Sequence, residues 1–462
     1  MVVLDGADAA TVEGGRLVRL RARAKEWRSK FTLAEVSGSL GDLGIYIPLL
    51  VGLTQQGSVF FVPSLFFAGF FNFVTGIAWD VPMCVQPMKT IAAVALAEDL
   101  PTNQVAAAGI LVSAMVFFLG FTRLIDVVNR AVPMAVVYGM QLGLGFSLMR
   151  KGMNLILGTR QYAMRPDCYV TAWLCGILAI YLQFHRKRAP TALILFFIGL
   201  IMAIERMARI GSPFSFKPEW PVHYALGDLS ANDWLYALGD AALPQLPLTT
   251  LNSVVSVCHL SKELFPEKKV PQRDVAISVG AMNVFCIVGA MPCCHGAGGL
   301  AAQHHFGART GASMLFLGFT KMVLAIAVGT PLNLLLTEFP GSVLGIMLVL
   351  SGLELAKQGK KLKDEPNLTV GYITAIVTLT LKTGIACIAG IAAALLMGGA
   401  EQLYAWFKEE WPKWMAKLSS KRGRFSNVKA DECDSPPTPP AQDSPFSDAT
   451  EGHDAQEAKP LS

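Results

Sequence analysis

Residues 80–90 (DVPMCVQPMKT), together with the apolar run 91–96, decide the expected fold of this chain. A second stretch, 290–302 (AMPCCHGAGGLAA), aligns with the first without a gap when Pro82 is set on Pro292. Each apolar run is too short to cross a bilayer, because a spanning helix needs about 20 residues. Each is therefore predicted to be a half-helix that begins inside a membrane. Paired broken helices of this kind point to the substrate site of a transporter.

The composition is that of a polytopic membrane protein. Of the 462 residues, 53% are hydrophobic and only 16% are charged, whereas a soluble domain usually carries about 25% charged residues. The net charge of +5 says little about a substrate, because it mostly reflects lysines and arginines in loops. We find no nucleophile–base pair, metal signature or nucleotide-binding loop, so we expect neither an enzyme nor a cofactor, a metal site or a nucleic-acid partner.

Fourteen apolar segments are predicted, seven on each side of a polar loop, in an otherwise all-α chain. Two of them are half-length, the third and the tenth. They lie at roughly 33–54, 59–79, 84–97, 103–121, 132–150, 168–184, 190–207, 233–262, 273–291, 294–305, 312–330, 332–356, 367–382 and 383–400.

The two halves resemble each other at more than one place. Residues 41–49 resemble 239–248 with one insertion. A second match has one constant offset: Val132-Pro133 aligns with Phe339-Pro340, Gly145 with Gly352, and Gly152 with Gly359. Since each half has an odd number of segments, the second copy must be inverted in the membrane. The predicted parts are a basic cytosolic leader (1–31), the first repeat (32–207), an extracytosolic loop (208–231), the second repeat (232–400), an interfacial segment (401–418) and a disordered cytosolic tail (419–462).

Loop charges predict the orientation. Cytosolic loops are enriched in lysine and arginine, and the basic loops follow the even-numbered segments, which places both termini in the cytosol. The segment 150–165 is an exception, because it is basic and should face outward. The basic loops that fit the rule are 123–130, 185–188, 262–273, the loop with Arg309, and 357–363.

The starts of the two half-helices predict an anion site. Pro87 is expected at the first helical position with Gln86 as the cap, and Ala297 and Gly296 take the same places in the second copy. A helix start exposes unpaired N–H donors and about half a positive charge. Two such starts facing each other suit a small anion that is rich in acceptor oxygens.

Lys89 is expected one turn into the first half-helix, where an ionisable residue inside a membrane is costly and usually functional. We expect it to add positive charge for the anion. The alternative is an ion pair with Asp42, Asp80 or Glu354.

A third set of polar residues interrupts the apolar segment 233–262. If residues 246–257 are helical, Gln245, Thr249 and Asn252 share one face with Ser256 and could line the substrate cavity. The alternative is hydrogen bonding between packed segments.

Three carboxylates are candidates for carrying coupling protons. Asp42 and Asp240 each follow a glycine near the end of a segment and could instead cap the backbone, whereas Glu354 lies deep in a segment but close to Lys357, a potential local ion-pair partner.

These motifs resemble the eukaryotic molybdate transporter family. The resemblance rests on 41–48 (GDLGIYIP), 82–89 (PMCVQPMK), 244–249 (PQLPLT) with 252–255 (NSVV), and 294–302 (CHGAGGLAA) with 307–311 (GARTG). The family is distantly related to the sulfate permeases (SulP), and this implies a core domain of segments 1–4 and 8–11 and a gate of segments 5–7 and 12–14. The anion would lie between the starts of segments 3 and 10. The candidate binding residues are Cys84, Gln86, Pro87, Met88, Lys89, His295, Gly296, Ala297, Gly298, Gln245, Thr249, Asn252 and Tyr46.

The chain departs from the sulfate permeases at two places. Those proteins usually carry a Ser-Arg pair near the start of segment 10, where this chain has Gly298-Gly299, so Lys89 would supply the missing charge. Their segment 8 often ends in Glu-Ser, and the similar place here reads Asn252-Ser253, which puts a glutamate-based proton step there in doubt.

The resemblance implies a high-affinity, secondary active molybdate importer with elevator-like alternating access. Moving one negative charge inward against 100 mV costs about 2.3 kcal/mol, so we expect protons as co-substrates in a symporter. A sulfate or other tetrahedral oxyanion permease, with sulfate as a competitor, is the nearest alternative; a molybdate-sensing receptor or a membrane enzyme would belong to another class. A homodimer is possible, and the membrane could be the plasma membrane or an endomembrane such as that of the vacuole.

Overall fold

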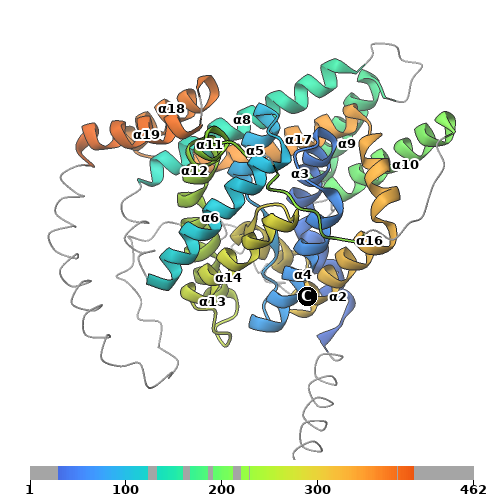
Figure 1. Cartoon of the computed structure of the whole chain (residues 1–462), viewed down its shortest axis with the longest axis horizontal. Coiled ribbons are helices and arrows are strands. Elements are labelled where there is room, and N and C mark those ends of the chain that lie inside the picture. Colours follow the sequence, from blue (N-terminus) through green and yellow to red (C-terminus); the bar gives the residue numbers. More distant parts are fainter. Residues whose placement is uncertain are drawn as a thin grey trace, which may run out of the picture. The chain divides into compact units, whose positions relative to one another are not determined.

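The computed structural model describes residues 30–122, 133–159, 167–185, 191–211, 220–227, 229–381 and 383–399. This part of the chain is mostly helical (Figure 1). The all-α prediction needs one correction, because two short strands, β1 (Val85–Pro87) and β2 (Cys293–His295), form an antiparallel sheet. The predicted interfacial segment and tail, and the leader up to residue 29, lie outside the described residues.

The first half of the chain supplies nine elements besides β1 in the described residues, and two of them, α2 and α3, form a bent pair around η1. They are α2 (Leu33–Ser39), η1 (Leu40–Asp42), α3 (Leu43–Gln56), α4 (Phe61–Trp79), α5 (Lys89–Glu98), α6 (Thr102–Thr122), α8 (Met134–Gly158), α9 (Tyr169–His185) and α10 (Thr191–Ile210).

The second half contains the same kinds of helices, with π-helical turns in its first segment. Its elements besides β2 are α11 (Ala231–Tyr236), η2 (Ala237–Ala242), α12 (Leu243–Leu248), η3 (Thr249–Ser256), α13 (Val257–Leu264), α14 (Gln272–Val284), η4 (Phe285–Val288), α15 (Ala297–His305), α16 (Ala312–Thr337), α17 (Gly341–Ala356), η5 (Lys357–Lys361), α18 (Glu365–Thr380), α19 (Thr383–Ala394) and η6 (Leu395–Gly399).

Helix length and composition agree with an integral membrane protein. Within the described ranges, five helices are long and apolar enough to cross a membrane, or six if the bent pair α2 and α3 counts as one span. In contrast, α5 has 10 residues and α15 has 9, about half of what a span requires.

The predicted segment 312–330 agrees with the apolar span Ala312–Gly329, whereas the predicted segment 332–356 is interrupted. Helix α16 continues to Thr337, and the break lies at Phe339 and Pro340. Helix α16 consists of two helices that meet at a kink at Val328 (φ −129°, ψ 18°), and Pro331 lies just after this kink. A proline ring clashes with the carbonyl four residues earlier, which explains a kink close to the predicted segment boundary.

Close backbone contacts hold the long helices together. Helix α4 packs against α16, α6 against α14, and α8 against α17. A Cβ atom added to Gly145 would lie 2.6 Å from the Gly352 carbonyl oxygen, and one added to Gly352 would lie 2.5 Å from the Gly145 carbonyl oxygen. The two backbones therefore touch, as at other small-residue helix crossings in membranes.

We predict that Gly145→Val destabilises the protein by about 1–3 kcal/mol, because the added side chain has to separate α8 from α17. The melting temperature of purified protein in detergent measures this. Gly158→Val is the matched control on the same helix, since nothing in the described residues lies within 4 Å of a Cβ added there. Equal losses in both variants would contradict the packing argument.

Candidate functional site

The two strands hold the starts of α5 and α15 side by side. Val85 pairs with His295 and Gln86 with Cys294. Beyond the pair, the Met88 N–H donates to the Pro292 carbonyl oxygen at 2.9 Å. The chain thus turns from strand to helix at neighbouring points in both halves.

Two buried asparagines complete the hydrogen bonding of these strands. Asn72 on α4 accepts from the Val85 N–H at 2.7 Å, and Asn283 on α14 accepts from the Cys293 N–H at 2.7 Å. The Asn283 amide also donates to the Cys293 carbonyl at 2.7 Å. Both asparagines are fully buried, so they supply the partners that buried backbone groups need.

The first helix start differs from its prediction. Pro87 is the last residue of β1, Met88 is the N-cap, and α5 begins at Lys89. Pairing with β2 keeps the backbone extended through Pro87, a constraint that the first stretch alone does not reveal. The second start agrees with the prediction, because Gly296 is the N-cap and α15 begins at Ala297.

Gln245 and Thr249 form a chain of hydrogen bonds at the first helix start. The Thr90 N–H donates to Gln245 Oε1 at 2.9 Å, and Gln245 Nε2 donates to Thr249 Oγ1 at 2.7 Å. Both side chains are fully buried and are not among the described residues that line the cavity. Gln245 thus forms the hydrogen bond between packed segments that the alternative predicts, whereas the bond of Thr249 lies within its own segment.

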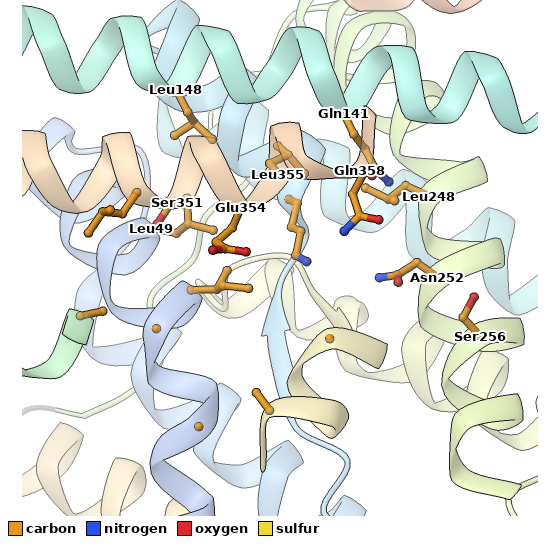
Figure 2. Close-up of a pocket in the computed structure, with 18 of the residues that line it drawn as sticks. Leu49, Gln141, Leu148, Leu248, Asn252, Ser256, Ser351, Glu354, Leu355 and Gln358 are labelled. Carbon is orange, nitrogen blue, oxygen red and sulfur yellow. The ribbon is translucent and has the colours of Figure 1, made fainter. Parts of the chain in front are cut away.

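A cavity of about 430 Å³ opens in front of the helix starts. Lys89 of α5, Asn252 of η3 and Gly298 of α15 line it on one side. Figure 2 shows Glu354 and Gln358 reaching the same space from α17 and η5, and Gln141 from α8. The cavity thus lies between the predicted core segments and the predicted gate segments.

Several predicted binding residues point elsewhere. The His295 ring contacts Trp79, with ring centroids 5.5 Å apart, and its Nε2 lies 3.1 Å from Ser278 Oγ. The ring of Tyr46 packs against Lys321, whose Nζ lies 3.5 Å from the ring centroid. In the described part of the chain, neither residue contributes to the cavity lining.

The remaining predicted residues are placed as follows. Cys84, Gln86, Pro87 and Met88 are buried behind the helix starts. Asp240 is buried in η2, and the described cavity lining does not include it. The side chain of Asp42 lies outside the described residues.

Lys89 has no hydrogen-bond or ion-pair partner within the described residues, although it lines the cavity and is only partly buried. Two of its predicted alternative partners are engaged elsewhere, because Asp80 binds Lys30 and Lys268, and Glu354 binds Lys357. The Lys89 ammonium therefore faces the cavity without a neutralising carboxylate among the described side chains.

Part of the cavity lining was not among the predicted binding residues. Tyr138 and Gln141 on α8 share a face with i, i+3 spacing. Ser351, Gln358 and Lys361 extend the Glu354 position into a polar stripe at i, i+3, i+7 and i+10. That stripe could have been found from its helical spacing, but Glu354 was considered alone.

Asp80 joins several segments at one end of the core. It accepts from the Lys30 and Lys268 ammonium groups and, at 3.0 Å, from the Gly311 N–H. Burial by itself raises the pKa of this carboxyl, but the hydrogen bonds from Lys268, Lys30 and Gly311 outweigh it and hold the pKa below its usual range. The residue directly before the first site segment is thus fixed to three other parts of the chain.

Comparison with solved structures identifies the fold. The chain resembles SLC26A9 with a TM-score of 0.57 and 14% identity, covering 86% of this chain and 72% of that one. The transmembrane domain of the cyanobacterial bicarbonate transporter BicA gives a TM-score of 0.57 and 15% identity, covering 78% of this chain and 97% of that domain. The chain therefore shares the fold of these two structures.

Sequence comparison gives the family. A family model described as "Molybdate transporter of MFS superfamily" matches residues 34–148 and 237–355. Molybdate transporter 2 of Arabidopsis thaliana is 34% identical over 417 residues, which cover 81% of this chain and 87% of that protein. Molybdate transporter 1 of Chlamydomonas reinhardtii is 32% identical over 518 residues, with 86% and 97% covered. This chain belongs to the molybdate transporter family, as its sequence motifs predicted.

We predict that Asp80→Asn lowers stability at neutral pH by about 1–3 kcal/mol, because it weakens charge-assisted hydrogen bonds. The folded-state pKa of Asp80 is depressed, so its contribution is present at neutral pH and is lost as the pH falls below about 4. Melting temperatures measured from neutral pH to below about pH 4 should therefore show that the stability difference between wild type and variant decreases as the pH falls. Glu267→Gln, an exposed carboxylate on the loop of Lys268, is the control, and a pH-independent gap for Asp80→Asn would contradict the account.

Proposed function

We propose that this protein is a secondary active molybdate importer that binds the dianion between the starts of α5 and α15. The observation that carries the proposal is that Lys89, the first residue of α5, and Gly298, in the first turn of α15, line one cavity. We choose molybdate as the substrate because the relatives are named as molybdate transporters.

The charge of this site fits a dianion. Each helix start contributes about half a positive charge, and the Lys89 ammonium adds a full one. The Thr90 N–H is already bonded to Gln245, so α5 has fewer donors to offer than the sequence suggested. The N–H groups in the first turn of α15 and the Lys89 ammonium are the donors we assign to the anion.

The arrangement supports two inverted repeats of seven segments each. Val85 and His295 are equivalent in the sequence alignment and are paired in the sheet. Gly145 and Gly352 are equivalent as well and touch across α8 and α17. Contact between equivalent residues on antiparallel elements is what a two-fold axis in the membrane plane produces. In this arrangement α5 and α15 are the two half-helices.

Alternating access would then move the core against the gate. The cavity already lies between these two groups of helices, and α5 packs directly against α8. Gln183, Thr191 and Lys361 line the cavity near segment ends that the loop charges assign to the cytosol. We therefore assign this conformation to the inward-facing state of an elevator-like cycle, with both termini in the cytosol.

An ion pair on the opposite side involves Lys151, which belongs to the exceptional basic segment at 150–165. Lys151, two turns before the end of α8, binds Asp99, the residue after α5, at 2.6 Å. Arg150 lines a small cavity together with Glu98. Lys151 has an acidic partner on the core, so in our proposal its location outside reflects a contact between gate and core.

We predict that Lys89→Ala reduces uptake of labelled molybdate into proteoliposomes by at least about tenfold, because the loss of one hydrogen-bonded charge costs more than about 1.4 kcal/mol. Lys89→Arg, which keeps the charge, should retain part of the uptake. The melting temperature in detergent checks that both variants are folded.

Lys360→Ala is the matched control for this experiment. It removes one cation from an exposed position that the described cavity lining does not include. Normal molybdate uptake by Lys89→Ala would remove Lys89 from the site, and an equal loss in Lys360→Ala would indicate a general charge effect.

We further predict that collapsing the proton gradient with an ionophore strongly reduces molybdate accumulation, because inward movement of a dianion opposes the membrane potential. Glu354 is the coupling candidate that faces the cavity, so Glu354→Gln should weaken the dependence of uptake on external pH. Glu365→Gln, outside the cavity lining, serves as the control. Accumulation that is indifferent to the gradient would contradict proton coupling.

A further inference from the structure

Three glycines follow one another closely at the start of α15, and packing requires two of them. A Cβ atom added to Gly296 would overlap the Gln86 side chain. One added to Gly299 would overlap the Cys84 sulfur and would lie 2.5 Å from Gln86 Nε2. Side chains at these two positions would push the first strand away from the helix, so their glycines have a structural reason.

Within the described residues, no packing contact of this kind requires a glycine at Gly298. Nothing in the described part of the chain lies within 4 Å of a Cβ added to it, and its φ is not positive. It is exposed to the cavity in the first turn of the helix. Inside a helix, glycine is less favourable than alanine by roughly 0.5–1 kcal/mol. Stability would therefore favour a side chain at this position.

We propose that the missing side chain at Gly298 leaves the space that lets the site prefer molybdate over the smaller sulfate ion. This inference rests on the proposed function. Both ions are tetrahedral dianions, so Lys89 and the helix N–H groups attract them through the same charge. The Mo–O bonds of molybdate are longer than the S–O bonds of sulfate. The volume next to the donors is therefore what distinguishes the two ions.

The cavity wall around Gly298 supports a role in size selection. Its neighbours Gly296 and Gly299 are held by Gln86 and Cys84, which are buried, so the helix start cannot easily shift to make room. A methyl group added at Gly298 would project into the cavity and occupy volume beside the first-turn N–H groups. Alanine and serine at this position keep the backbone N–H donor.

The test compares wild type with Gly298→Ala and Gly298→Ser in proteoliposomes. Labelled molybdate uptake gives the half-saturation concentration of molybdate, and unlabelled sulfate gives an inhibition constant. For Gly298→Ala we expect the molybdate value to rise roughly tenfold, since one added methyl group in a fitted pocket has an effect of this order. The sulfate constant should stay the same or decrease, so the preference for molybdate falls by a similar factor.

Gly239→Ala is the matched control. Gly239 is also helical, has nothing within 4 Å of an added Cβ in the described residues, and is not part of the described cavity lining. This variant should keep the wild-type preference. Melting temperatures show whether each variant is folded, and an unfolded Gly298→Ala would itself contradict the open space at this position.

The outcomes separate this inference from the proposed function. Suppose that wild type takes up molybdate and that Gly298→Ala weakens the binding of both anions equally or leaves the binding of both unchanged. Then Gly298 does not select by size, and only the present inference fails. If Gly298→Ser shifts the preference toward sulfate as Gly298→Ala does, the inference is supported. If the wild-type protein takes up no molybdate, the proposed function fails as well.

Discussion

The hydrogen bonds between β1 and β2 fix where two helices begin, and the site follows from those two starts. Extended backbone inside a membrane protein is tolerated only where protein groups satisfy it. Here Asn72 and Asn283 bind the strands from the adjacent helices, and Gln245 binds the first turn of α5. Of these three side chains, Gln245 was the predicted substrate ligand. Their contacts show that they hold the backbone, while the cavity is left to Lys89, Asn252 and Gly298.

The close contacts in the rest of the molecule have a related role. Gly145 and Gly352 let α8 and α17 touch in the predicted gate, and Asp80 binds Lys30, Lys268 and the Gly311 N–H within the predicted core. Each group of helices therefore has its own internal connections, while the cavity lies between the two groups. This distribution of contacts is what a core moving as a unit against a gate would need, and it supports the proposed elevator-like cycle.

The sequence predicted the two short helices, their pairing and part of the cavity lining, because half-length apolar runs and an intramembrane lysine are local signals. It could not predict that Pro87 ends a strand, since that depends on pairing with Cys293 in the other half. The directions of Gln245, Thr249, His295 and Tyr46 also depend on neighbours from distant segments. Gln141 and Gln358 were not predicted, because polar residues on the gate can be recognised as cavity lining only when the position of the core opposite them is known.

The most direct test is a structure of the protein with bound molybdate, in which anomalous scattering at the molybdenum absorption edge locates the metal. We expect one strong peak between the first turns of α5 and α15, next to the Lys89 ammonium and Gly298. A peak at the rim near Lys361, or molybdate bound at a place remote from both helix starts, would contradict this expectation.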